Sequence, residues 1–118
     1  MLRPEDVYEL YVRAWNEPEQ ALALLEECWA QDGVYADDEV PEGVVGRAAF
    51  ADLIAESHKT LPGFRVWETS PPRLLAGRLA ATWTQDGGDP LESLSGTDVI
   101  EFAPDGRIAR VTNVLAIP

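Results

Sequence analysis

The stretch ESLSGTDVIEFAPDGRIARVTNVLA, residues 92–116, decides how this chain folds. Runs of residues suited to strands lie on both sides of Pro104-Asp105-Gly106, a sequence typical of turns. We therefore predict two strands, at about 92–102 and 107–116, that pair as an antiparallel hairpin. A sheet is thus expected at this end of the chain.

Turn residues divide the preceding part of the chain in the same way. Ser70-Pro71-Pro72 and Asp86-Gly87-Gly88-Asp89-Pro90 bound two more runs suited to strands, at about 64–69 and 74–85. Gly77 is expected to mark a bulge or bend within the second of these runs. The C-terminal half therefore predicts four antiparallel strands in a meander.

The N-terminal half has apolar residues at helical spacing instead. This spacing predicts helices from Pro4 to about Asn16, from Pro18 to about Asp32 and from about Arg47 to Leu61, with a short strand at 34–38. The order α-α-β-α-β-β-β-β is that of an α+β fold, in which the N-terminal helices pack on one face of a mostly antiparallel sheet. Since no linker is visible, we expect residues 1–118 to form a single domain.

The composition argues against several classes of partner and compartment. Nine Lys plus Arg stand against 21 Asp plus Glu, which gives a formal net charge of −12. Nucleic acids and anionic membranes both attract positive proteins, so neither is an expected partner. No apolar run approaches the ~20 residues that span a bilayer. The single Cys28 cannot form an internal disulfide, and the first residues lack a signal-peptide pattern, so we expect a cytoplasmic protein.

The residue types present also argue against most cofactor chemistry. One His and one Cys cannot supply a usual zinc site, and no Gly-rich phosphate loop occurs. No Ser stands in the Gly-x-Ser-x-Gly setting of serine hydrolases. We therefore expect neither a metal nor an organic cofactor.

The last predicted strand suggests a second copy of the chain as a partner. Neither of its faces is designed for water, because Ala109, Val111, Asn113 and Leu115 alternate with Ile108, Thr112, Val114 and Ala116. A single layer of helices covers only one face of a sheet. We therefore predict a homodimer formed through the other face.

Asp98 is the residue that indicates chemistry most directly. Strand alternation places it on the same side as Ile100 and Phe102, which a core-facing strand buries. Burial disfavours the charged carboxylate, so we expect a raised pKa and a role as general acid or base, or as a neutral hydrogen-bond donor. The alternative is that Asp98 only satisfies a nearby backbone or hydroxyl donor.

Two further candidates for catalysis are Asp37 and Tyr11. Asp37 ends the short strand and faces opposite to Asp38, and its pairing with Tyr35 on the helix-facing side favours Asp37 as the inward residue. The same residues also fit a solvated acidic turn. Tyr11 lies on the apolar stripe of the first helix, where a phenol either finds a partner for its hydroxyl or simply packs.

Other side chains expected to face the same interior are candidates for binding a ligand. His58 follows Ile54 by one helical turn, and Asn113 shares an inward face with Val111. Inward-facing tryptophans, and a single inward-facing His, are more often part of a packed core than of a ligand-binding site. The candidate ligand-binding residues are Trp15, Phe50, Ile54, His58, Trp83, Val111 and Asn113.

The chain resembles the SnoaL-like branch of the nuclear-transport-factor-two-like superfamily, which includes polyketide cyclases and ketosteroid isomerases. The resemblance covers nearly all of the chain and rests on the order and spacing of short motifs. These are Tyr11-Val12, GVYAD at 33–37, GRAAF at 46–50, GTD at 96–98 and DGRI at 105–108. The resemblance implies a conical α+β barrel, in which a curved sheet wraps round three helices, with a pocket at the wide end and frequent dimerisation.

The resemblance also implies roles for the three catalytic candidates. The ketosteroid isomerase pattern places a Tyr and a protonated Asp in an oxyanion hole opposite an Asp base, and it falls on Tyr11, Asp98 and Asp37. Two features depart from related patterns. Asp38 replaces the Pro that often follows the base, and RVTN at 110–113 replaces the His-Trp pair of many cyclases. The Arg-x-Asp of similarly folded epoxide hydrolases does not occur.

We therefore expect a small-molecule pocket protein, with a cofactor-free isomerase or cyclase activity on a small apolar or aromatic carbonyl compound. The alternative is a non-catalytic ligand-binding or protein-interaction module, because fold does not fix function. Inward carboxylates that face an open cavity favour catalysis, whereas side chains that fill the cavity favour the module.

Overall fold

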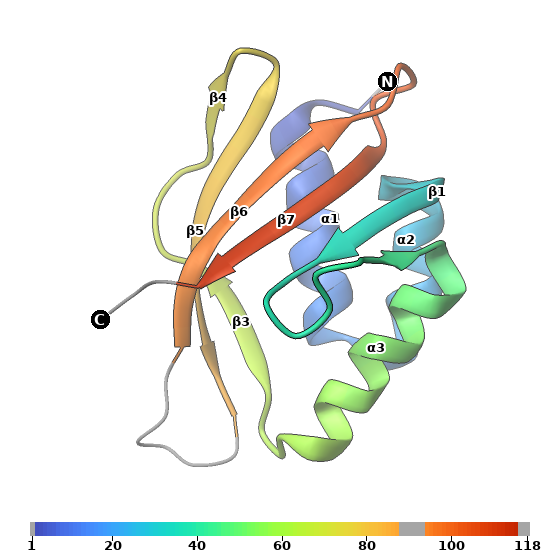
Figure 1. Ribbon diagram of the computed structural model, residues 1–118, viewed down its shortest axis with the longest axis vertical. Helices are drawn as coiled ribbons and strands as arrows, with labels where there is room; N and C mark the ends of the chain where they lie inside the picture. The colour runs from blue at the N-terminus through green and yellow to red at the C-terminus, as the bar shows by residue number, and fades with distance from the viewer. Residues whose placement is uncertain (1, 88–93, 116–118) are drawn as a thin grey trace.

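The computed structural model describes residues 2–87 and 94–115, which form a layer of helices against a seven-stranded sheet (Figure 1). The helices are α1 (Pro4–Asn16), the short 3-10 helix η1 (Pro18–Gln20), α2 (Ala21–Cys28) and α3 (Arg47–Thr60). The strands are β1 (Trp29–Ala36), β2 (Val44–Val45), β3 (Arg65–Glu68), β4 (Arg73–Leu75), β5 (Arg78–Asp86), β6 (Leu94–Phe102) and β7 (Ile108–Leu115). Among these described helices, none is long and apolar enough to cross a membrane.

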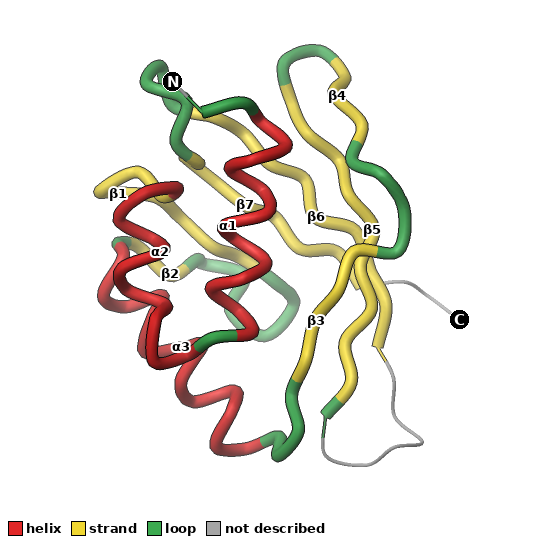
Figure 2. Tube along the Cα trace, turned by 180° about the vertical axis from the view of Figure 1, so that it is seen from behind, coloured by secondary structure: helices red, strands yellow, loops and turns green. Residues whose placement is uncertain are grey.

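The sheet is mixed and mostly antiparallel. Its strand order is β2-β1-β7-β6-β5-β3, with β4 also paired to β5, and of the ladders between described strands only β1–β7 is parallel. All three α-helices lie on the same face, as Figure 2 shows from the helical side. The predicted α+β class is therefore confirmed, and the sheet stays open between β2 and β3.

The boundary between the second helix and the first strand differs from the prediction. The helix ends at Cys28, and Trp29 already belongs to β1, which the sequence pattern began only at Val34. Trp29 pairs with Ile108 of β7, and after a register shift Val34 pairs with Arg110. Pairing with a strand far along the chain therefore overrides the helical spacing that extends past Cys28.

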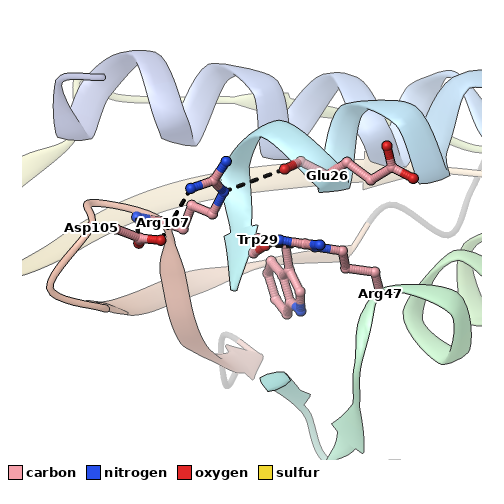
Figure 3. A network of polar contacts seen from close by, with 5 residues as sticks. All are labelled: Glu26, Trp29, Arg47, Asp105 and Arg107. Atoms are coloured by element: carbon pink, nitrogen blue, oxygen red, sulfur yellow. Dashed lines mark hydrogen bonds and ion pairs between the residues drawn. The ribbon is translucent and has the colours of Figure 1, made fainter. Parts of the chain in front are cut away.

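Two arginines secure this boundary (Figure 3). Arg47 Nε donates to the carbonyl oxygen of Trp29 at 2.8 Å, and Arg107 Nε donates to that of Glu26 at 3.3 Å. Arg107 also pairs with the Asp105 carboxylate at 3.1 Å. The end of a helix leaves carbonyl groups without intrahelical hydrogen-bond donors, and the two arginines supply donors to two carbonyl groups here. They also tie α3 and the β6–β7 turn to the end of α2.

The predicted strand at 74–85 is a hairpin rather than one bent strand. Ala76 and Gly77 have φ angles of 52° and 77°. A tight two-residue hairpin turn of this kind needs positive φ at both central positions, and Leu75 pairs with Arg78 across it. Gly77 therefore reverses the chain instead of bending it.

A register shift in the β6–β7 ladder changes one predicted facing. Asp98 pairs with Asn113 and Ile100 with Val111, but Phe102 pairs with Ile108 after the shift. Ile108 is fully buried, so it lies on the helix-facing side with Val111, not on the opposite side. A bulge inserts one residue into a strand and so reverses the alternation beyond it.

Candidate functional site

A cavity of about 260 Å³ lies between the helices and the sheet, beside the C-terminal end of α3; we call it the outer cavity. Its lining comes from α1, the end of β1 and the turn after it, α3, β5, β6 and β7. The lining residues are Trp15, Tyr35, Asp37, Asp38, Glu39, Ser57, Leu61, Phe64, Trp83, Gln85, Leu94, Asn113 and Leu115.

A smaller space of about 30 Å³, the inner chamber, shares much of that lining. The shared residues are Trp15, Tyr35, Phe64, Trp83, Gln85 and Asn113, and the chamber adds Tyr11, Val66 and Asp98. A cavity needs roughly 10–15 Å³ of such space to hold one water molecule, so the chamber is small but large enough for a polar group. The inner chamber is therefore the deep end of the outer cavity and has room for a single polar group.

Asp98 lies on the wall of the inner chamber with only 3% of its surface exposed. No other charged side chain in the described part of the chain is buried. Its Oδ2 accepts a hydrogen bond from the Tyr8 hydroxyl at 3.4 Å, and its Oδ1 has no partner among the described residues. Burial raises the pKa of Asp98 to about 7, although hydrogen bonds from Tyr8 and Asn113 favour the charged form. Near neutral pH this carboxyl can therefore give or take a proton.

Two more buried polar atoms lack partners beside Asp98. Asn113 Oδ1 and Trp83 Nε1 form no hydrogen bond within the described structure, and both residues line the inner chamber. Buried polar groups in folded proteins nearly always have a partner. An acceptor on Asn113 and a donor on Trp83, next to the free oxygen of Asp98, are therefore suited to a polar group of a bound molecule.

Gly96 makes room for one wall of this chamber. It pairs with Trp83 across β5 and β6, and a Cβ atom added at Gly96 would lie 2.6 Å from the Trp83 ring. Only a residue without a side chain lets the indole pack flat against β6. The glycine two residues before Asp98 was thus a signal of the cavity that pattern reading did not use.

Asp37 lines the outer cavity but has an environment quite unlike that of Asp98. Its Oδ2 accepts a hydrogen bond from the Tyr35 hydroxyl at 2.8 Å, and its Oδ1 accepts from the backbone N–H groups of Glu39 and Val40 at 2.8 and 3.0 Å. Asp38 lines the same cavity and is exposed. The carboxylate of Asp37 therefore holds the turn after β1 while it borders the cavity.

Tyr11 is fully buried on the wall of the inner chamber. Burial and the nearby Asp98 charge raise the pKa of its phenol, and a hydrogen bond with Trp15 lowers it. The hydroxyl that contacts Asp98 directly belongs to Tyr8, whose ring stacks on Tyr11 with centroids 5.8 Å apart. Sequence reasoning missed Tyr8, although it lies one helical turn before Tyr11 on the same apolar stripe.

The seven candidate ligand-binding residues divide into two groups. Trp15, Trp83 and Asn113 line both the outer cavity and the inner chamber. The other four line neither space: Phe50, Ile54 and Val111 are fully buried in the core, and His58 is half-buried.

These four residues support the walls instead. Phe50 packs on Trp29 and Tyr35 with ring centroids 4.6 and 4.9 Å away. The Nε2 atom of His58 lies 2.7 Å from the carbonyl oxygen of Trp15, and its ring meets Phe64 edge-on at 4.9 Å. The lining that sequence reasoning missed comes largely from strand ends and loops, where periodicity carries no information: Glu39, Leu61, Phe64, Gln85, Leu94 and Leu115.

Within residues 2–87 and 94–115, no three His, Cys, Asp or Glu side chains cluster in a way that could hold a metal ion. Asp98, Asp37 and the tyrosines of the site can form hydrogen bonds and transfer protons.

The chain belongs to the SnoaL-like domain family, because the sequence profile of that family matches residues 8–111. This confirms the resemblance that the motifs indicated. No curated protein sequence matches the chain.

Solved structures with the same fold include proteins of three related kinds. A candidate isomerase of the SnoaL-like family from Agrobacterium tumefaciens has 24% identity and a TM-score of 0.82 over 95% of this chain and 96% of its own. A candidate ketosteroid isomerase from Kribbella flavida has 22% identity and a TM-score of 0.76, and the match covers 98% of this chain and 78% of its own. A candidate polyketide cyclase from Sinorhizobium meliloti has 19% identity and a TM-score of 0.74, and the match covers 92% of this chain and 93% of its own.

Two more distant structures of this fold contain small molecules. A protein from Catenulispora acidiphila with 15% identity and a TM-score of 0.74 is in complex with trimethylamine; the match covers 91% of this chain and 82% of its own. TerC, with 13% identity and a TM-score of 0.72, is co-crystallised with polyporic acid; the match covers 97% and 92%. At these identities the likeness shows the fold alone.

Proposed function

We propose that this protein binds a small, largely apolar carbonyl compound in the outer cavity and moves a proton on it without a cofactor. The observation that carries the proposal is the free Oδ1 of Asp98, a buried carboxyl at the deep end of a cavity lined by aromatic rings. A carboxyl whose pKa is about 7 is matched to proton transfer at neutral pH. The small molecules bound by two neighbours of the same fold agree with a ligand-binding role.

The proposed step divides the work between two carboxyls. Protonated Asp98 donates a hydrogen bond to the carbonyl oxygen, with Tyr11 as a second donor. Asp37 removes the proton from the adjacent carbon, whose C–H electron pair becomes the enolate, and the proton then returns to another carbon. Such a division requires the two carboxyls to differ in environment. Asp98 is desolvated and has side-chain hydrogen bonds from Tyr8 and Asn113 only, whereas Asp37 is half-buried with three donors, two of them backbone N–H groups.

A non-catalytic binding module is the second candidate, and one observation favours it. Three of the roughly four lone-pair directions of the Asp37 carboxylate are occupied by Tyr35 and two backbone N–H groups. A group so engaged is well suited to holding a turn and less free to take a proton. In this case Asp98 would bind the polar end of the ligand without chemistry.

The proposal includes a homodimer in the cytoplasm. The sheet face away from the helices carries half-buried Val99 and a Val114 that is 52% exposed, beside the exposed Arg78–Glu101 ion pair, and a second copy packed on this face would cover the two valines. The sequence has a single cysteine, the buried free thiol of Cys28, and a chain without an internal disulfide is typical of a reducing compartment.

Hydrogen–deuterium exchange tests the catalytic proposal. A simple β,γ-unsaturated ketone is incubated with the protein in deuterated buffer, and the loss of its α-proton signal is followed by NMR. Asp37→Asn should slow exchange by roughly a hundredfold or more while para-ethylphenol, a mimic of the enolate, still binds. Glu26→Gln, a change at an exposed site that lines neither space, is the matched control. Phenol binding without exchange in the wild type would favour the binding module, and absence of both would remove the proposed function.

A further inference from the structure

The lining of the outer cavity includes three consecutive carboxylates at its solvent-exposed side, which we call the acidic rim: Asp37, Asp38 and Glu39. Hydrogen bonds to Tyr35 and to two backbone N–H groups fix the position of Asp37. The side chains of Asp38 and Glu39 are exposed beside it. No ion pair to any of the three occurs within the described structure, so their charges face the entrance without a counter-ion.

The rest of the lining adds no positive charge. None of the described residues that line the outer cavity or the inner chamber is Lys, Arg or His. Aromatic rings make up much of the wall, from Tyr11, Trp15, Tyr35, Phe64 and Trp83. The faces of such rings attract cations, because their quadrupole is negative there. The aromatic walls and the acidic rim therefore both favour a cation in the cavity.

The inner chamber gives an independent sign that a ligand occupies this space. Asp98, 3% exposed, presents a carboxyl oxygen that has no partner among residues 2–87 and 94–115, and the same holds for Asn113 Oδ1 beside it. A protonated Asp98 carboxyl can donate a hydrogen bond or accept one, and Asn113 Oδ1 can accept one, so these atoms fit an uncharged polar group such as a carbonyl or a hydroxyl. A carboxylate or phosphate at either end would meet carboxyl oxygens and no cation. The net charge of −12 also repels anions at longer range.

We propose that the cavity selects its ligand by charge: the ligand directs an uncharged polar group toward Asp98, carries a protonated amine at the acidic rim, and is not an anion. This deepens the proposed function, on which it rests for the orientation of the ligand. It does not depend on turnover, because charge selection is a property of binding.

Three phenols with the same ring and different tails test the inference by isothermal titration calorimetry at pH 7. Tyramine has a protonated amine, para-ethylphenol is uncharged, and para-hydroxyphenylacetate has a carboxylate. We expect tyramine to bind roughly tenfold more tightly than para-ethylphenol, and the carboxylate roughly tenfold more weakly, from exposed ion pairs and cation–π contact.

Two double variants locate the effect. Asp38→Asn with Glu39→Gln should reduce the advantage of tyramine over para-ethylphenol, measured on the same variant, to roughly threefold or less. Asp37 is left in place because its carboxylate holds the turn. The matched control, Glu26→Gln with Glu27→Gln, removes the same charge from α2 residues that line neither space and should keep the full advantage.

The possible results separate the inference from the proposed function. Equal affinity for all three phenols, or tighter binding of the carboxylate, overturns charge selection while leaving the proposed function intact. An equal loss of the tyramine advantage in both double variants assigns the effect to overall charge and also overturns it. Failure of every phenol to bind removes the proposed function, and the inference falls with it.

Discussion

Replacing Asp98 by Asn should remove a large part of the pH dependence of stability. The pKa of Asp98 rises from 3.8 to about 7 because burial disfavours its charged form, which corresponds to about 4 kcal/mol once both states are ionised. Between about pH 4 and 7 the folded protein holds a proton that the unfolded chain has released. The contribution of Asp98 to the free energy of unfolding of the wild type therefore falls as pH rises through this range, by up to about 1.4 kcal/mol per pH unit, and the fall ends above pH 7.

Urea denaturation at several pH values measures this effect. The amide of the Asp98→Asn variant cannot ionise, so the difference in the free energy of unfolding, variant minus wild type, should grow by about 2–3 kcal/mol between pH 5 and pH 8. Thr97→Asn places the same side chain on the opposite face of β6 and serves as the control, whose curve should run parallel to that of the wild type. A constant difference across this range for Asp98→Asn would refute the argument that Asp98 is neutral in the folded state.

Three further substitutions test other parts of the account. Tyr8→Phe removes a hydrogen bond that favours the ionised carboxylate, so it should raise the pKa of Asp98 above about 7; an unchanged pKa by NMR titration would show that the contact is not made in solution. Gly96→Ala forces a Cβ atom against the Trp83 ring and the backbone and should cost about 1–3 kcal/mol of stability, visible as a lower Tm in calorimetry. Val114→Asp, on the sheet face away from the helices, should halve the mass seen by light scattering without unfolding the chain, whereas a monomeric wild type would remove the dimer.

The fold class and the facing of Asp98 were predictable from the sequence because both depend on local periodicity. Strand alternation places Asp98 with Ile100, and both are buried in the structure. The helical stripe that includes Tyr11 and Trp15 likewise packs inward. Such patterns indicate which side of a helix or strand packs on the core. They were therefore sufficient to predict that these side chains face the same interior.

Other features depend on contacts between distant parts of the chain, which periodicity does not report. Trp29 begins a strand because β7 lies beside it in parallel, and Ile108 faces inward because of the register shift in β7. The sequence pattern also could not predict how far the cavity extends into the core. Phe50, for example, lies on the predicted face of α3 but fills the core, because the rings packed on it leave no open space there.

The most direct test of the central claim is carbon-detected NMR titration of the Asp98 carboxyl, without and with para-ethylphenol. We predict that the free protein gives a pKa of about 7 for Asp98. Addition of the phenol should shift the Asp98 signal while the exposed carboxyl of Asp52 stays in place. A pKa below about 4, the unperturbed value, or an Asp98 signal that does not respond to bound phenol, would contradict a ligand site built on this carboxyl.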